Sequence, residues 1–136
     1  MLTVLVIDES RSRAGEICAG LALAGYQVAA ILAGSENLTA EVEKLQPDVI
    51  LIDIDSPSRD TLEHLAAMNK NMPRPVVIFT QEDGQATIRD AVKAGVSAYI
   101  VDGLDPKRIK PIVEVARARF EDTQALRREL DEVSQK

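Results

Sequence analysis

Hydrophobic residues in this chain gather in short runs, and longer stretches with helical spacing separate these runs. The apolar runs are rich in valine, isoleucine or leucine and cover residues 2–7, 26–32, 49–54, 75–80 and 98–101. The stretches that follow them carry apolar residues at the spacing of a helix face, over residues 11–24, 36–45, 59–69, 84–94 and 106 onward. The pattern predicts five strands, each followed by a helix.

Residues that favour helix ends lie at the borders of these stretches. Gly25 and Gly95 each follow the last periodic residue of a predicted helix, where a left-handed backbone conformation caps the helix. Side chains that accept hydrogen bonds from the first helical N–H groups precede three of the helices, at Ser10, Ser35 and Asp105. Pro106 then stands at the first helical position, which tolerates proline.

The order of the elements limits the fold. Strands that alternate with helices through short loops are typical of a parallel sheet with helices on both faces. The run 49–52 is apolar at every position, which fits a strand that is covered on both faces. The sequence therefore predicts an α/β fold: a doubly wound, five-stranded parallel (βα)5 sheet of the flavodoxin-like kind.

Four acidic residues follow two of the predicted strands. Asp8 and Glu9 end the first strand, and Asp53 and Asp55 end the third. In a doubly wound sheet whose order places these strands side by side, their carboxyl ends meet at the switch point. Two unit charges about 5 Å apart repel by roughly 3 kcal/mol at an effective dielectric constant near 20, so the cluster favours a bound cation. A small set of oxygen ligands completed by water suits Mg²⁺ better than Ca²⁺.

The last helical stretch is about twice as long as a typical globular helix. A set of positions alternates at spacings of three and four, as in a heptad seam: Ile109, Ile112, Ala116, Arg119, Thr123, Leu126, Leu130 and Val133. The seam is strongest toward its end, because Arg119 and Thr123 are polar. We expect a globular domain over residues 1–118 and a helical extension over 119–136. The extension is either a solvated tail or a coiled coil that leads to an output domain and forms a homodimer.

Composition narrows the class of protein. The net charge of -6 argues against a nucleic-acid backbone as the direct partner of this segment. The single cysteine excludes an internal disulfide and fits a reducing compartment. No apolar run reaches the roughly 18–20 residues of a membrane span, and the first residues lack the basic region of a signal peptide. We expect a cytoplasmic protein.

Several segments carry a family resemblance. The stretches VLVIDES, PDVILIDIDSP, VVIFT and AVKAGVSAYIV resemble the receiver (CheY-like) domain of two-component response regulators, over residues 1–118. The resemblance implies a non-catalytic signalling domain in which a sensor histidine kinase phosphorylates Asp53. It also implies that Asp8 and Glu9 hold Mg²⁺ together with Asp53 and the backbone carbonyl of Asp55. Thr80 corresponds to the hydroxyl residue that contacts the phosphoryl group, and Tyr99 corresponds to the aromatic switch residue.

The chain departs from the receiver pattern after the fifth strand. Receivers ordinarily have Lys-Pro there, whereas this chain has Asp102 and Gly103. An anion thus replaces the lysine that pairs with the acceptor and its phosphoryl group. Without the proline we expect an all-trans loop after Val101. Arg59 or Lys107 could supply a substitute charge.

Within receivers, the stretches IDIDSPSRD and AGVSAYIVDGL are most similar to NasT-type regulators. In these proteins an RNA-binding ANTAR domain, which antiterminates transcription, follows a coiled coil. This resemblance implies contact with RNA only through a C-terminal domain beyond these residues, and control by a kinase or by a ligand-sensing inhibitor protein. Three alternatives stay open: a pseudo-receiver switched by a partner protein without phosphorylation, a Toprim-like Mg²⁺-dependent nuclease, and an interaction domain whose acids are idle.

Overall fold

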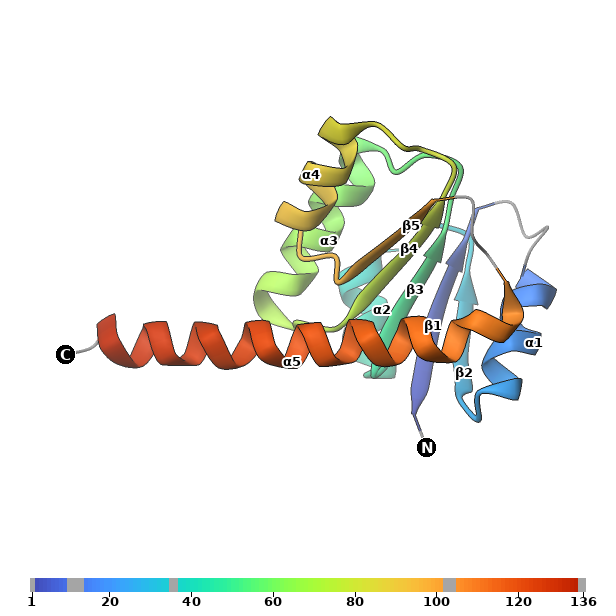
Figure 1. Cartoon of the computed structure of the whole chain (residues 1–136), viewed down its shortest axis with the longest axis horizontal. Helices are drawn as coiled ribbons and strands as arrows, with labels where there is room; N and C mark the ends of the chain where they lie inside the picture. The colour runs from blue at the N-terminus through green and yellow to red at the C-terminus, as the bar shows by residue number, and fades with distance from the viewer. Residues whose placement is uncertain (1, 10–13, 35–36, 102–104, 135–136) are drawn as a thin grey trace.

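The computed structural model describes residues 2–9, 14–34, 37–101 and 105–134 of the chain. One sheet of five parallel strands has the order β2-β1-β3-β4-β5 (Figure 1). The strands are β1 (Thr3–Asp8), β2 (Gln27–Leu32), β3 (Val49–Asp53), β4 (Val76–Thr80) and β5 (Ala98–Val101). The helices are α1 (Ala14–Leu23), α2 (Leu38–Leu45), α3 (Arg59–Asn71), α4 (Gln85–Lys93), the 3-10 helix η1 (Pro106–Arg108) and α5 (Ile109–Ser134). The predicted doubly wound α/β fold is confirmed.

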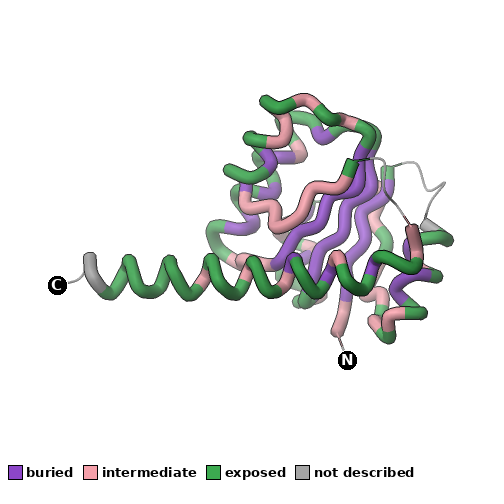
Figure 2. Tube along the Cα trace, in the orientation of Figure 1, coloured by how far each residue is buried: buried purple, intermediate pink, exposed green. Residues whose placement is uncertain are grey.

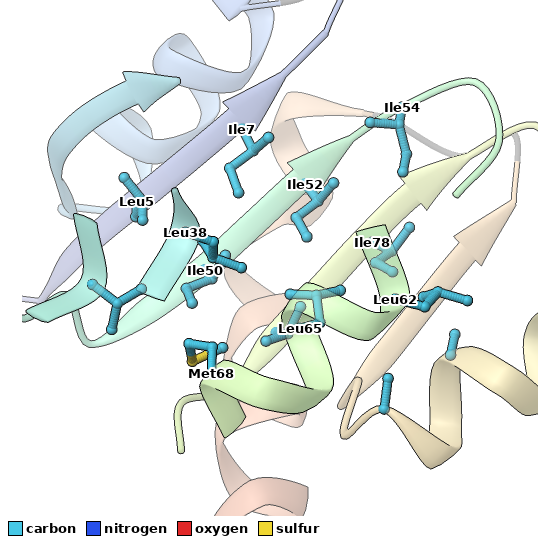
Figure 3. Packing of buried hydrophobic residues seen from close by; sticks show 14 residues of the cluster. Leu5, Ile7, Leu38, Ile50, Ile52, Ile54, Leu62, Leu65, Met68 and Ile78 are labelled. Atoms are coloured by element: carbon cyan, nitrogen blue, oxygen red, sulfur yellow. The ribbon is translucent and has the colours of Figure 1, made fainter. Parts of the chain in front are cut away.

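The sheet separates two hydrophobic clusters, because successive side chains of a strand point to opposite faces. One face packs against α1 and α5 and carries Val4, Val6, Val49, Leu51, Val77 and Phe79. The other packs against α2, α3 and α4, and Figure 3 shows its side chains, among them Leu5, Ile7, Ile50, Ile52 and Ile78. The central strands β1, β3 and β4 are therefore covered on both faces, as the continuous apolar run in β3 predicted, whereas the edge strands β2 and β5 stay partly exposed.

Some helix ends differ from the sequence predictions. The helix α2 begins at Leu38 rather than at residue 36, because the side chain of Asn37 accepts the hydrogen bond of the Ala40 N–H at 3.1 Å. Ser10 and Ser35, the predicted caps of α1 and α2, lie outside the described residues. Gly25 and Gly95 have φ angles of 83° and 100°, as expected of C-terminal caps.

The last helical segment begins in an unexpected form. Asp105 caps it as predicted, by accepting the Lys107 N–H at 3.0 Å. The first turn, η1, is nevertheless a 3-10 helix, so that the α-helix starts only at Ile109.

Helix α5 has a buried first half and an exposed second half. Ile109, Val113 and Ala116 are fully buried against the sheet, whereas Leu126 and Leu130 are 61% and 65% exposed. Figure 2 shows that α5 continues past the edge of the sheet and that its free part is exposed. No described helix has the length and apolar composition that crossing a bilayer requires.

Candidate functional site

Asp8 and Asp53 lie side by side at the carboxyl ends of β1 and β3. They are register partners in the parallel sheet, and their exposed fractions are 0% and 5%. Register partners on neighbouring strands lie about 5 Å apart, and their side chains point to the same side of the sheet. The prediction that acids from these two strands come together is thus confirmed for Asp8 and Asp53.

Glu9, the next predicted ligand, directs its side chain toward Gly34 in the loop after β2. A methyl group placed on Gly34 would lie 3.2 Å from Cγ of Glu9. Within the described part of the chain, no group of three or more Asp, Glu, His or Cys side chains is arranged to hold a metal ion. The described structure therefore assembles a pair of carboxylates, and the side chain of Glu9 approaches Gly34.

Asp55 presents its backbone carbonyl to the end of the neighbouring strand β4, while its side chain is exposed. The Thr80 hydroxyl donates to this carbonyl at 2.8 Å, and the Gln81 N–H donates to it at 3.2 Å. Thr80 itself is 2% exposed. The carbonyl predicted to bind a metal thus already accepts two hydrogen bonds.

Thr80 is connected to Tyr99 through the peptide groups of Glu82. The Glu82 N–H donates to Oγ1 of Thr80 at 3.2 Å, and the Tyr99 hydroxyl donates to the Glu82 carbonyl at 2.8 Å. Burial raises the pKa of Tyr99, and the nearby charges of Glu82 and Asp83 raise it further, so the hydroxyl keeps its proton. The two predicted switch residues therefore belong to one hydrogen-bonded chain.

Glu82 is the member of this chain that sequence analysis missed. Its contribution comes from the backbone N–H and carbonyl, and such groups leave no signature in the residue type. The available signal was its position two residues after Thr80, in the loop that faces the end of β5.

Asp102 stands at the usual lysine position, and two residues were expected to supply a substitute positive charge. Asp102 and Gly103, and with them the expected all-trans loop, lie outside the described residues. Arg59 pairs with Glu63 of the same helix, at 3.1 Å between Nε and Oε1, and both side chains are exposed. Lys107 is exposed in η1. Arg59 is therefore engaged away from the acidic pair.

The acidic pair has the chemistry that a hard divalent cation requires. Both groups are carboxylates, and nitrogen and sulfur ligands are absent from the pair, which suits Mg²⁺. At about 5 Å and an effective dielectric constant near 20, their repulsion is roughly 3 kcal/mol, and a cation would relieve it. The residues present fit a Mg²⁺ ion that takes Asp8 and Asp53 as ligands and water at its remaining positions.

Comparison with known proteins places the chain in a family. Residues 4–114 match the family model described as the response regulator receiver domain. The chain is 32% identical over 139 residues to the protein-glutamate methylesterase/protein-glutamine glutaminase 2 of Photobacterium profundum, a match that covers 98% of this chain and 32% of that protein. It is 24% identical to the transcriptional regulatory protein PdtaR of Mycobacterium tuberculosis, over 82% of this chain and 55% of that protein. The chain thus spans a third to about half the length of these relatives.

Solved structures agree on the fold. The receiver domain protein (CheY-like) of Methanospirillum hungatei superposes with a TM-score of 0.76 at 20% identity, over 90% of this chain and 98% of that one. A pilus assembly-related protein of Burkholderia pseudomallei also superposes with a TM-score of 0.76, at 22% identity, over 88% of this chain and 91% of that one. The family match covers residues 4–114, which include both Asp8 and Asp53. No comparison supports the nuclease alternative. The chain belongs to the response regulator receiver domain family of two-component signalling.

Proposed function

We propose that Asp53 is the phosphoacceptor of this receiver domain. The observation that carries the proposal is the pairing of Asp53 with Asp8 at the carboxyl edge of the sheet, with Thr80 at the end of the adjacent strand β4. Asp53 is 5% exposed, so its carboxylate has a fixed position from which to attack an incoming group. The proposed donor is the phosphohistidine of a sensor kinase, since receiver domains interact with histidine kinases.

In the proposed reaction, an oxygen of the Asp53 carboxylate forms a bond to phosphorus while the phosphorus–nitrogen bond of the donor breaks. The electron pair of that bond stays on the ring nitrogen, and a proton on the other ring nitrogen or one taken from water leaves the imidazole neutral. Receiver domains typically bind Mg²⁺ at this site, where the ion neutralises charge on the donor's oxygens. Asp8, Glu9, Asp53 and the Asp55 carbonyl are the groups that we propose to hold it.

The proposed output signal passes from Thr80 to Tyr99. A phosphoryl group on Asp53 would attract the Thr80 hydroxyl, which now donates to the Asp55 carbonyl. Movement of Thr80 would release the Glu82 N–H. The carbonyl of the same residue accepts the Tyr99 hydroxyl, so Tyr99 would be affected as well. The phosphoryl group would in this way alter the surface made by α4, β5 and α5.

Intact-mass analysis after incubation with acetyl phosphate and Mg²⁺ tests the phosphoacceptor role. The wild-type chain should gain the mass of one phosphoryl group, and Asp53→Asn should not. Asp60→Asn, an exposed acid in the first turn of α3, is the matched control and should be labelled like the wild type. Failure of the wild type to react, with a competent receiver labelled in parallel, would contradict the proposal.

A second candidate function is that of a pseudo-receiver, which a partner protein switches by binding without phosphorylation. The feature that favours it is Asp102 at the usual lysine position, because an added anion opposes a phosphoryl group. The two candidates differ in the Asp102→Lys variant. A phosphoacceptor weakened by the missing lysine should be labelled faster in this variant, whereas a site that has lost the chemistry should stay unlabelled.

We also propose that residues 119–136 form a coiled-coil linker through which two copies pair. Support comes from the exposed Leu126 and Leu130 on a helix that continues past the sheet. The output that we propose beyond it is a cytoplasmic RNA-binding antitermination domain of the ANTAR type, on the strength of the resemblance in IDIDSPSRD and AGVSAYIVDGL. Expression of the complete gene product followed by RNA crosslinking would test that output. A product that crosslinks to no RNA would contradict it.

A further inference from the structure

A cavity of about 350 Å³ lies between α5 and the turn from α4 to β5. Its walls come from the last turns of α3 and α4, from that turn and from the middle of α5. This is the amino end of β5, whereas Asp8, Asp53 and Thr80 lie at the carboxyl ends of their strands. The cavity therefore belongs to the opposite edge of the sheet from the proposed phosphorylation site.

Three cationic side chains line this cavity: Lys93 of α4 and Arg119 and Arg127 of α5. The described lining contains no aspartate or glutamate. In the part of the chain that the structure describes, none of these three cations forms an ion pair. The concentration of positive charge is notable in a chain whose net charge is -6.

Two helix ends that face the cavity do not balance this charge. The C-terminal ends of α3 and α4 each carry about half a negative charge from their last carbonyl groups. Together they offset about one of the three cations, which leaves an excess of about two positive charges. Such an excess in a concave site favours a ligand with at least two negative charges.

A buried amide points to a ligand at the same place. Asn69, in the last turn of α3, lines the cavity and is 8% exposed, and its side chain lies against Gly95. Its Oδ1 atom has no hydrogen-bond partner among the described residues. Buried polar atoms are normally satisfied, and an asparagine amide offers both a donor and an acceptor. Because Oδ1 accepts, the missing partner is a donor, which the amino group of a nucleobase can supply and a phosphoryl oxygen cannot.

The spacing of the two arginines sets the shape of the ligand. Arg119 and Arg127 are eight residues apart on one helix, which places their backbones roughly 12 Å apart. Guanidinium groups bind phosphate oxygens in a two-pronged geometry. Val92 and Phe120 add apolar surface to the same lining. We propose that this cavity binds a small anion with two or more phosphoryl groups, of the size of a nucleoside polyphosphate.

Isothermal titration calorimetry of the full chain with ADP, ATP and pyrophosphate tests this proposal. EDTA is present throughout, so that binding through a divalent ion at the acidic pair is prevented. We expect saturable binding of at least one of these probes that weakens as salt is added, and little binding of adenosine or orthophosphate. Absence of saturable binding by all three polyphosphates would overturn the proposal.

Charge-reversal variants locate the site. The double variant Arg119→Glu with Arg127→Glu should bind at least about tenfold more weakly, because both charge-assisted contacts are lost. Arg128→Glu, an exposed arginine on the same helix outside the lining, should bind like the wild type. Asp53→Asn should also bind normally. If the double variant binds the polyphosphates as tightly as the wild type, the cavity is not a phosphoryl site. The same conclusion holds if the substitutions change only the sedimentation of the chain.

Discussion

The Thr80 hydroxyl donates a hydrogen bond of 2.8 Å to the backbone carbonyl of Asp55, and this bond ties the end of β4 to the loop after β3. The same carbonyl accepts the Gln81 N–H at 3.2 Å. If a group on Asp53 accepts the hydrogen bond of the Thr80 hydroxyl, the bond between Thr80 and the Asp55 carbonyl must break. Conversely, any cation that binds the carbonyl must weaken its bond with Thr80 or with Gln81. The two events that we propose at this site are thus mechanically linked.

Replacement of Thr80 by valine tests the strength of this bond. Valine has nearly the same shape but no hydroxyl, so the Glu82 N–H loses its partner and the Asp55 carbonyl keeps only the Gln81 N–H, in a partly buried place. We expect the free energy of unfolding to fall by about 1–2 kcal/mol, measured by urea denaturation. Thr80→Ser keeps the hydroxyl and should lose clearly less. Equal losses in the two variants would show that packing of the methyl group, and not the hydrogen bond, supports this loop.

Asparagine at position 8 or 53 should stabilise the chain when divalent cations are absent. Either change removes one of two neighbouring buried carboxylates, whose repulsion amounts to roughly 3 kcal/mol at about 5 Å. Thermal unfolding in EDTA should therefore shift to higher temperature in Asp8→Asn and Asp53→Asn. Asp131→Asn, an exposed acid on α5, should leave the midpoint unchanged.

The same variants should lose the response to magnesium. A cation that binds only the folded chain raises its unfolding midpoint by mass action, so Mg²⁺ should stabilise the wild type and the Asp131→Asn control. Asp8→Asn and Asp53→Asn should respond weakly. A wild-type midpoint that is indifferent to millimolar Mg²⁺ would argue against a metal site at this edge of the sheet.

The hydrophobic pattern located every strand, most directly the central ones, because buried parallel strands are apolar at each position. Val49 to Ile52 is the clearest case, and the observed strand ends one residue after it, at Asp53. Helix starts were predicted less well, since several residue types can cap a helix. Asn37 caps α2, and its competitor Ser35 stands only two residues before it. The 3-10 turn at Pro106 packs against α1, a long-range contact that no local pattern records.

The sequence could predict the position of those site residues that stand at the ends of strands. Asp8 and Asp53 come together because β1 and β3 are neighbours, and this follows from the doubly wound topology. Glu9 stands just beyond β1, where the loop rather than the strand directs the side chain, and it turns toward Gly34. The part played by Glu82 rests on its backbone groups, so the identity of the side chain carried no information about it.

Tyr26 and Glu114 form a pH-dependent tie between the turn after α1 and helix α5. The tyrosine hydroxyl donates to Oε1 of Glu114 at 2.6 Å. Burial and this bond raise the pKa of Tyr26 to about 12, and the bond lowers the pKa of Glu114 below its model-compound value of 4.5. A carboxyl group whose pKa is lowered in the folded chain stabilises the fold at a pH above its unfolded-state pKa. This stabilisation is lost as the pH falls through its folded-state pKa. A raised tyrosine pKa stabilises the fold below pH 10 and loses this effect as the pH rises toward 12.

Tyr26→Phe should accordingly lower the free energy of unfolding by about 0.5–1 kcal/mol near pH 7, a small value because the pair is largely solvated. The difference from the wild type should shrink in strong acid, where Glu114 is protonated. Urea denaturation at the two pH values measures both quantities. A difference that stays constant between them would show that the hydroxyl contributes without the charge of Glu114.

Two exposed leucines of α5 should control pairing of two chains. Leu126 and Leu130 are 61% and 65% exposed, so their replacement by glutamate should leave the fold intact. Burial of a leucine contributes about 1.5–3 kcal/mol, so the double variant should raise the dimer dissociation constant at least about a hundredfold in sedimentation analysis. Ala125→Glu, exposed on the same helix but outside the seam, is the matched control. A wild-type chain that stays monomeric at high concentration would rule out this interface within residues 1–136.

Two glycines of α1 should respond oppositely to alanine. A methyl group on Gly20 would lie 2.9 Å from the carbonyl oxygen of Pro106 and would also meet the side chain of Ile109, so α1 and the start of α5 would have to move apart. A methyl group on Gly15 would have no described atom within 4 Å. Alanine favours a helix by up to about 1 kcal/mol over glycine, so Gly15→Ala should stabilise the chain by that amount.

Gly20→Ala gains the same helix preference but should destabilise by about 1–3 kcal/mol, because overpacking outweighs it. Urea denaturation of the two variants measures the difference. Because the contact joins α1 to the segment that follows β5, a loss confined to Gly20→Ala would mean that close approach at this glycine fixes where α5 begins. Stabilisation in both variants would show instead that η1 can shift at little energetic cost, and that the start of α5 is held by its burial against the sheet at Ile109 and Val113.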